Sequence, residues 1–225
     1  MEIISHRGAC TKFPENTFLA FDEAVKQGCD AIETDLLISK DGRIVLRHDD
    51  LIRHHHHWCY VGDLTWEELQ KIDLGGGERI PALEDFALRY GHQKKLYLDL
   101  KCFGLAAPLC AFLKNHPDLL PHIHFTSFIH EEILELADLL PQAGRSILMA
   151  AVPLHFKPLF DASKTHEISL FRGYLNEKIV NSLKNHQIKV RVYPVNIPDE
   201  AARLKSWGVD AIFTDEPGLM AFLKS

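Results

Sequence analysis

Three carboxylates lie among apolar residues in strand-like stretches of this sequence. Glu33 and Asp35 alternate with apolar neighbours, so in a β-strand they share one face. Asp99 and Lys101 share a face in a later stretch that is flanked by leucines. Like charges that are buried together need a shared proton or a cation, and hard oxygen ligands suit Mg2+ or Ca2+. If the two stretches are neighbouring strands, the sequence predicts a divalent-cation site; a structural ion-pair network is the alternative interpretation.

Two histidines follow other apolar stretches. His6 and Arg7 end the stretch that begins at Glu2, and His48 stands next to Asp49 at the end of another. Two imidazoles that titrate near neutrality can act as the base and the acid in the cleavage of a phosphodiester. The Arg7 guanidinium can hold phosphoryl oxygens. Because a single histidine is more often structural, the hypothesis depends on the whole set.

Nine short apolar runs alternate with helical patterns, the order that gives a parallel sheet covered by helices. They are residues 2–5, 31–38, 43–47, 96–100, 123–127, 146–152, 167–171, 189–195 and 211–214. The second and third runs are joined only by residues 39–42, which predicts an antiparallel hairpin with Gly42 at positive φ. Eight parallel strands remain, and they predict an α/β fold of the (β/α)8 TIM-barrel type with a short hairpin extension after strand 2. A doubly wound open sheet is the alternative.

Helix boundaries are marked by capping residues. Asn16 or Thr17 precedes a helical pattern, Thr65 and Glu68 fit a capping box, and Pro198 opens a later helix. With no linker or internal repeat between these elements, we expect one domain over residues 1–225.

Composition limits the possible partners and compartments. The net charge of −6 offers no broad basic surface, so nucleic acid is not expected as a partner. No stretch holds ~18 consecutive apolar residues, which argues against stable membrane insertion. The start MEIISHRG has no signal-peptide pattern, and the five cysteines form no CxxC pair. We therefore expect a soluble cytoplasmic protein.

The candidate residues belong to a series of motifs that run from one end of the chain to the other. Glu33 follows His6 by 27 positions, and His48 follows Asp35 by 13. Together the motifs resemble the glycerophosphodiester phosphodiesterase family. They are His6-Arg7-Gly8, Pro14-Glu15-Asn16-Thr17, Glu33-Thr34-Asp35, Lys40-Asp41-Gly42, His48-Asp49, Leu98-Asp99-Leu100-Lys101, Val195-Asn196 and the segment Trp207 to Asp215.

This resemblance implies a TIM-barrel enzyme that hydrolyses glycerophosphodiesters to sn-glycerol 3-phosphate and an alcohol, through a cyclic phosphate. It implies one divalent cation as cofactor, Mg2+ or Ca2+ with Mn2+ as a further candidate, and a small phosphodiester as partner. The implied site comprises the acid and base His6 and His48, the cation ligands Glu33, Asp35 and Asp99, and the substrate contacts Arg7, Lys101 and Tyr193. Glu15 and Asn16 are interpreted as structural, through capping and hydrogen bonds.

The sequence departs from the family pattern at three places. Asp99 stands where the family usually has Glu, so this ligand is one methylene shorter. Tyr193-Pro194 replaces Trp-Thr, and the run His54 to His57 replaces a Thr-rich stretch. Successive side chains of an extended segment point to opposite sides, so we expect the four histidines to form a solvated loop at the mouth of the site rather than a second metal site.

Two other functions remain open at this point. A lysophospholipase D or sphingomyelinase D activity would use the same barrel and would have to admit an acyl chain. A catalytically silent barrel that binds a phosphorylated ligand would be expected to lack a histidine or a ligand carboxylate.

Overall fold

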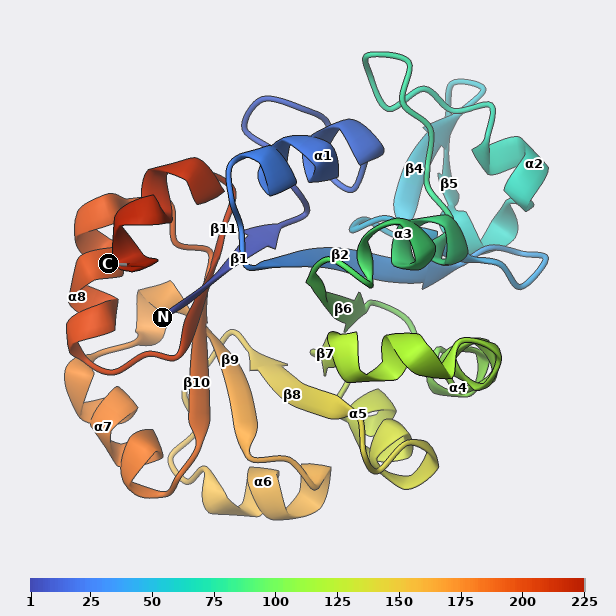
Figure 1. Ribbon diagram of the computed structural model, residues 1–225. Coiled ribbons are helices and arrows are strands. Elements are labelled where there is room, and N and C mark those ends of the chain that lie inside the picture. Colours follow the sequence, from blue (N-terminus) through green and yellow to red (C-terminus); the bar gives the residue numbers. More distant parts are fainter. Residues whose placement is uncertain (225) are drawn as a thin grey trace.

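Eight parallel strands close into a ring in the computed structural model, which describes residues 1–224 (Figure 1). Each strand pairs in parallel with the next one around the ring, and β1 pairs with both β2 and β11, which closes it. The TIM-barrel prediction is confirmed and the open-sheet alternative is wrong. The ring contains β1 (Glu2–His6), β2 (Ala31–Ile38), β6 (Lys95–Leu100), β7 (Ile123–Ser127), β8 (Gly144–Met149), β9 (Glu167–Phe171), β10 (Lys189–Tyr193) and β11 (Ala211–Thr214).

Helices surround the ring, as Figure 1 shows. Thr17 caps the first of them and accepts a hydrogen bond from the Ala20 N–H, and Thr65 and Glu68 form the predicted capping box. The α-helices are α1 (Phe18–Lys26), α2 (Trp66–Leu69), α3 (Leu83–Tyr90), α4 (Ala106–Asn115), α5 (His130–Leu139), α6 (Lys157–Ser163), α7 (Glu177–Asn185) and α8 (Pro198–Ser206). Short 3-10 helices cover Val61–Asp63, Pro117–His122, Arg172–Tyr174 and Pro217–Lys224. Within residues 1–224, no helix is both long and apolar enough to cross a membrane.

The predicted hairpin extension lies outside the ring. Strand β3 (Ile44–Leu46) pairs antiparallel with the end of β2, and Gly42 in the connecting turn has φ +82°. A second hairpin, which the sequence did not predict, follows it: β4 (Leu51–His54) pairs with β5 (His57–Tyr60).

The turn of this second hairpin consists of histidines. His55 and His56 have φ values of 44° and 68°, so two non-glycine residues adopt the left-handed conformation that a tight two-residue turn requires. Because Asn and Gly usually supply this conformation, a run of histidines carries no recognisable hairpin signal. The expected solvated loop is therefore an exposed hairpin tip. The body of the hairpin lies beside α2 (Figure 1), and its Ile52 belongs to a small separate core that comprises Leu37, Val45, Ile52, Val61, Leu64, Leu69 and Ile80.

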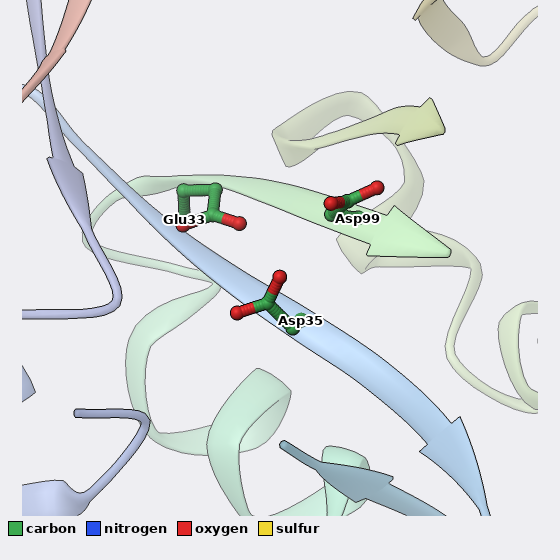
Figure 2. A group of neighbouring side chains, drawn as sticks. All are labelled: Glu33, Asp35 and Asp99. Carbon is green, nitrogen blue, oxygen red and sulfur yellow. The ribbon is translucent and has the colours of Figure 1, made fainter. Parts of the chain in front are cut away.

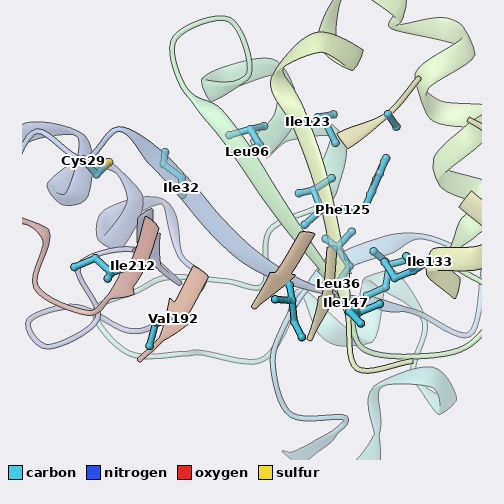
Figure 3. Close-up of a cluster of buried hydrophobic side chains, with 14 of the residues drawn as sticks. Cys29, Ile32, Leu36, Leu96, Ile123, Phe125, Ile133, Ile147, Val192 and Ile212 are labelled. Atoms are coloured by element: carbon cyan, nitrogen blue, oxygen red, sulfur yellow. The ribbon is translucent and has the colours of Figure 1, made fainter. Parts of the chain in front are cut away.

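Alternation along the strands divides the barrel into an outer core and a filled interior. Outward-facing side chains such as Ile32, Leu96 and Phe125 pack under the helices (Figure 3). Inside the ring, Tyr97 and Phe213 belong to a buried apolar cluster that plugs the barrel. The interior positions beyond this plug, toward the carboxyl ends of the strands, carry the candidate site.

Candidate active site

Three buried carboxylates converge at the carboxyl ends of two neighbouring strands. Glu33 and Asp35 project from β2, and Asp35 lies opposite Asp99 of β6 in the parallel register. Figure 2 shows Glu33 and Asp35 on β2 and Asp99 on the adjacent strand β6. One oxygen from each lies within 4.8 Å of the others, and all three residues are at most 5% exposed. The structure thus brings together the three residues that the sequence predicts as cation ligands.

The electrostatics of this cluster favour a bound cation. Burial, with the nearby Asp35 carboxylate acting in the same direction, raises the pKa of Glu33. Burial also raises the pKa of Asp99 to about 7, although the Lys101 ammonium opposes the shift. Within residues 1–224, the buried Oδ1 of Asp99 accepts no hydrogen bond. An unpartnered buried oxygen beside two further carboxylates is the donor set that a hard divalent cation requires, so the residues present fit such an ion.

Two basic side chains border the carboxylates. Arg7 places its Nε 3.1 Å from Asp35 Oδ2 and donates through a terminal nitrogen to Glu15 Oε2 at 3.0 Å. Lys101 Nζ lies 3.4 Å from Asp99 Oδ2 and 3.7 Å from Asp35 Oδ1. Glu15, interpreted from the sequence as a purely structural loop residue, therefore holds the Arg7 guanidinium in place beside the site.

The loop after β1 also orients a ligand carboxylate. Asn16 Nδ2 donates to Asp35 Oδ2 at 3.0 Å, and Asn16 Oδ1 accepts from Thr34 Oγ1 at 2.7 Å. Asn16 is not the helix cap, because Thr17 takes that place. Its φ of 56° is a left-handed conformation that Asn tolerates better than most residues. Sequence reasoning missed this role, since an Asn before a helix most often indicates capping.

Each of the two histidines is paired with a carboxylate. His6 ends β1, and its Nδ1 lies 2.7 Å from Oδ1 of Asp215, which follows β11. His48 follows β3, and its Nδ1 lies 2.7 Å from Oδ1 of the adjacent Asp49. The hydrogen bonds from His6 and Asn196 outweigh the opposing effect of burial and lower the pKa of Asp215 to about 2. Asp215 stands in a motif that the sequence singles out, but no role for it was predicted.

One cavity of about 180 Å3 opens onto both histidines and all three carboxylates. Its opposite wall is apolar. Tyr193, predicted as a substrate contact, lies in this wall. Its hydroxyl donates a hydrogen bond to the Met149 carbonyl at 3.0 Å, and its ring packs against that of Phe128 with 6.0 Å between the ring centroids. The lining residues are His6, Arg7, Glu33, Asp35, His48, Asp99, Lys101, Thr126, Phe128, Leu148, Tyr193 and Phe213. All eight predicted site residues are among them, whereas the histidine run 54–57 is not.

The sequence profile of the glycerophosphoryl diester phosphodiesterase family matches residues 6–105 and 110–219. The chain belongs to this family. The matched ranges include every residue of the cavity, so the family assignment covers the site as well as the barrel. The protein is thus a phosphodiesterase, as the sequence predicts.

Known glycerophosphodiester phosphodiesterases resemble the chain over nearly its whole length. The enzyme of Bacillus subtilis (strain 168) is 29% identical over 252 residues, which cover 98% of this chain and 85% of that one. The enzyme of Caldanaerobacter subterraneus subsp. tengcongensis is 29% identical over 231 residues, 96% of this chain and 94% of that one. A solved Oleispira antarctica phosphodiesterase, in complex with its product sn-glycerol-3-phosphate, superimposes with a TM-score of 0.87 at 26% identity and covers 100% of this chain and 97% of that one.

Proposed function

We propose that this phosphodiesterase hydrolyses deacylated glycerophosphodiesters, such as glycerophosphocholine, to sn-glycerol 3-phosphate and an alcohol, with a divalent cation and two catalytic histidines. The observation that carries the proposal is the convergence of three buried carboxylates and two histidines on one cavity. The product named for the Oleispira antarctica neighbour supports the same product here.

Glu33, Asp35 and Asp99 would hold the cation, which we take to be Mg2+ or Ca2+, with Mn2+ as a further candidate. When bound, such an ion neutralises charge on the phosphoryl group and increases the acidity of a hydroxyl beside it. The three residues supply oxygen ligands only, which disfavours soft metals.

Arg7 and Lys101 bind the phosphoryl oxygens. The ion pairs of Arg7 use Nε and one terminal nitrogen, so among the described residues the other terminal nitrogen remains available for phosphate. Because Asp35 and Glu15 fix the guanidinium before substrate arrives, little side-chain entropy is lost on binding. Lys101 lies on the same side of the cavity as Asp99 and contributes a second positive charge.

His6 and His48 divide the proton transfers. One histidine removes the proton from the glycerol hydroxyl next to the phosphodiester, whose oxygen then forms a bond to phosphorus. The other protonates the head-group alkoxide as its bond to phosphorus breaks, which leaves a cyclic phosphate. Water then opens the ring with the two roles reversed, and sn-glycerol 3-phosphate is released.

Deacylated diesters are favoured over lysophospholipids because relatives that match nearly the whole chain are named glycerophosphodiester phosphodiesterases. A silent, ligand-binding barrel is disfavoured because both histidines and all three carboxylates are in place.

The test is a product analysis by 31P NMR with Mg2+, Mn2+ or Ca2+ added. Glycerophosphocholine and lysophosphatidylcholine are supplied separately at equal concentration. We expect a transient cyclic phosphate signal and then sn-glycerol 3-phosphate, with the deacylated diester consumed faster. Preferential cleavage of lysophosphatidylcholine would support the lysophospholipase D alternative, and no cleavage of any glycerophosphodiester would contradict the proposal.

A further inference from the structure

Barrel closure places a carboxylate behind one of the two histidines. Strands β1 and β11 pair with Ser5 opposite Thr214, so the residues that follow, His6 and Asp215, meet at the rim. Asp215 Oδ1 lies 2.7 Å from His6 Nδ1, and the Cys10 thiol donates to the same oxygen at 3.2 Å. With Nδ1 engaged, Nε2 is the ring nitrogen that is left for substrate.

The second carboxylate oxygen of Asp215, which does not face His6, accepts a hydrogen bond from Asn196. Asn196 Nδ2 donates to Asp215 Oδ2 at 2.6 Å. The orientation of this amide is determined by two donors, since Asn196 Oδ1 accepts from Thr214 Oγ1 at 3.1 Å and from the Asp215 N–H at 2.9 Å. Each carboxylate oxygen of Asp215 therefore faces a donor, and the donor Asn196 cannot turn around without losing two hydrogen bonds.

We propose that Asp215, oriented by Asn196, is a positioning residue that holds His6 as the Nδ1–H tautomer and presents its Nε2 to the substrate. This inference rests on the proposed catalytic role of His6. A carboxylate on one imidazole nitrogen fixes both the tautomer and the direction of the ring.

The other histidine–carboxylate pair provides an internal comparison. His48 and Asp49 are separated by the same 2.7 Å, but the Asp49 side chain is 63% exposed, against 21% for Asp215. Water competes for an exposed carboxylate, and the second oxygen of Asp49 lies 3.9 Å from a terminal nitrogen of Arg47, too far for a hydrogen bond like the one that Asn196 donates to Asp215. Asp49 therefore constrains its histidine less than Asp215 does.

The network predicts what an amide at position 215 would do. In Asp215→Asn one oxygen becomes an NH2 donor, which conflicts either with Asn196 Nδ2 or with His6 Nδ1–H. Because two donors lock the Asn196 amide, the conflict is relieved at the histidine, whose Nδ1 turns into an acceptor while the proton moves to Nε2. The variant thus carries a histidine with a proton already on Nε2, where it blocks the proton acceptance that each histidine performs in one of the two steps.

A second substitution should restore the original tautomer. In the double variant Asp215→Asn with Asn196→Asp, the carboxylate is at position 196 and the amide at position 215. The carboxylate accepts hydrogen bonds from the NH2 group of this amide and from Thr214 Oγ1. The amide oxygen then faces His6 and accepts from Nδ1–H again. The double variant retains the size and the total charge of the wild-type pair, so it separates orientation from packing.

The experiment measures kcat and KM with glycerophosphocholine, together with the 15N chemical shifts of the His6 ring, assigned by comparison with His6→Ala. We expect kcat of Asp215→Asn to fall by about 10²- to 10³-fold with the Nε2–H tautomer, while KM changes by less than about threefold. The double variant should regain the Nδ1–H tautomer and at least about tenfold in kcat. Asp210→Asn, which removes a carboxylate that pairs with Lys184 elsewhere, is the control and should keep wild-type turnover.

Two outcomes would overturn the inference. One is wild-type kcat in Asp215→Asn while His6→Ala is inactive, and the other is a loss of turnover with an unchanged His6 tautomer. Normal turnover in His6→Ala would instead contradict the catalytic role of His6 itself, so failure of the positioning role and failure of the proposed function are distinguishable.

Discussion

Asp35 and Asp99 occupy the same register position on the neighbouring parallel strands β2 and β6, so two carboxylates face each other beside Glu33. Two acids in this arrangement repel each other, and Lys101 reaches both of them at 3.4 and 3.7 Å. Arg7 also pairs with Asp35, at 3.1 Å, but it is shared with Glu15, so two positive charges do not balance the three carboxylates and the cluster requires a further positive charge.

Removal of one carboxylate should weaken cation binding. In Asp99→Asn the cation loses one full negative ligand charge, and we expect the Mg2+ or Ca2+ concentration for half-maximal activity to rise by about tenfold or more. The measurement is a metal titration of glycerol 3-phosphate release after treatment with EDTA. Asp210→Asn is the matched control, and an unchanged titration curve for Asp99→Asn would exclude Asp99 as a ligand.

Asp99→Glu tests the length of the same ligand. The longer side chain carries the same carboxylate one methylene farther from the backbone, and it must fit a site in which Asp99 is 5% exposed. We expect cation binding to be kept, with the midpoint of the titration within about tenfold of wild type. Activity of Asp99→Glu that no longer depends on the added cation would contradict the assignment of Asp99 as a cation ligand.

Replacement of Arg7 tests whether its ion pairs with Asp35 and Glu15 contribute to kcat/KM. A lysine presents a single point charge and cannot contact Asp35, Glu15 and phosphate together. For Arg7→Lys we expect kcat/KM to fall by about 10- to 100-fold, the equivalent of one lost hydrogen bond to a charged group. Arg79→Lys, which alters an exposed pair with Asp73, should leave kcat/KM unchanged.

Gly8 allows the chain to turn directly behind His6 and Arg7. It has φ +90°, and a Cβ at this position would lie 2.5 Å from Ala20 Cβ. Gly28 has a similar φ of +81° but nothing within 4 Å, so Gly28→Ala isolates the conformational cost, about 1 kcal/mol. Gly8→Ala adds a backbone collision and should lower the free energy of unfolding by about 3 kcal/mol or more in chemical denaturation. Equal losses in the two variants would contradict this account.

A buried histidine at the amino-terminal end of the barrel should make stability depend on pH. Burial and the nearby Arg191 lower the pKa of His124 well below its usual value. Glu167 lies 3.6 Å away but is already paired with Arg191 and Lys189, so it does not offset this shift.

Because the unfolded chain takes up this proton first, the stability that neutral His124 contributes is present above about pH 6.5 and is lost as pH falls below that value, by at most about 1.4 kcal/mol per pH unit. The free energy of unfolding, measured by chemical denaturation at several pH values from 8 to 5, should depend less steeply on pH in His124→Gln than in wild type. The exposed His155→Gln should retain the wild-type slope, and a wild-type slope in His124→Gln would rule out this origin.

Strand periodicity was sufficient to place the carboxylate cluster and its lysine. Glu33, Asp35, Asp99 and Lys101 could be placed together because alternate residues of a strand share a face and barrel strands follow chain order. The second hairpin was missed because His55 and His56 adopt left-handed conformations without the Asn or Gly that usually indicates them.

The supporting contacts were harder to predict because they join distant residues. Asp215 is 209 positions from His6, and only closure of β1 onto β11 brings them together. The links from Glu15 to Arg7 and from Asn16 to Asp35 depend on the path of one loop over the strand ends. Local patterns such as capping signals contain no information about such contacts.

The most direct test of the central claim is the rate of glycerol 3-phosphate release from glycerophosphocholine, measured after EDTA treatment and again after Mg2+, Mn2+ or Ca2+ is restored. The proposed site predicts that EDTA abolishes release, that one of these ions restores it, and that His6→Ala and His48→Ala remain inactive with the ion present. Undiminished release in EDTA, or normal release by either histidine variant, would contradict it.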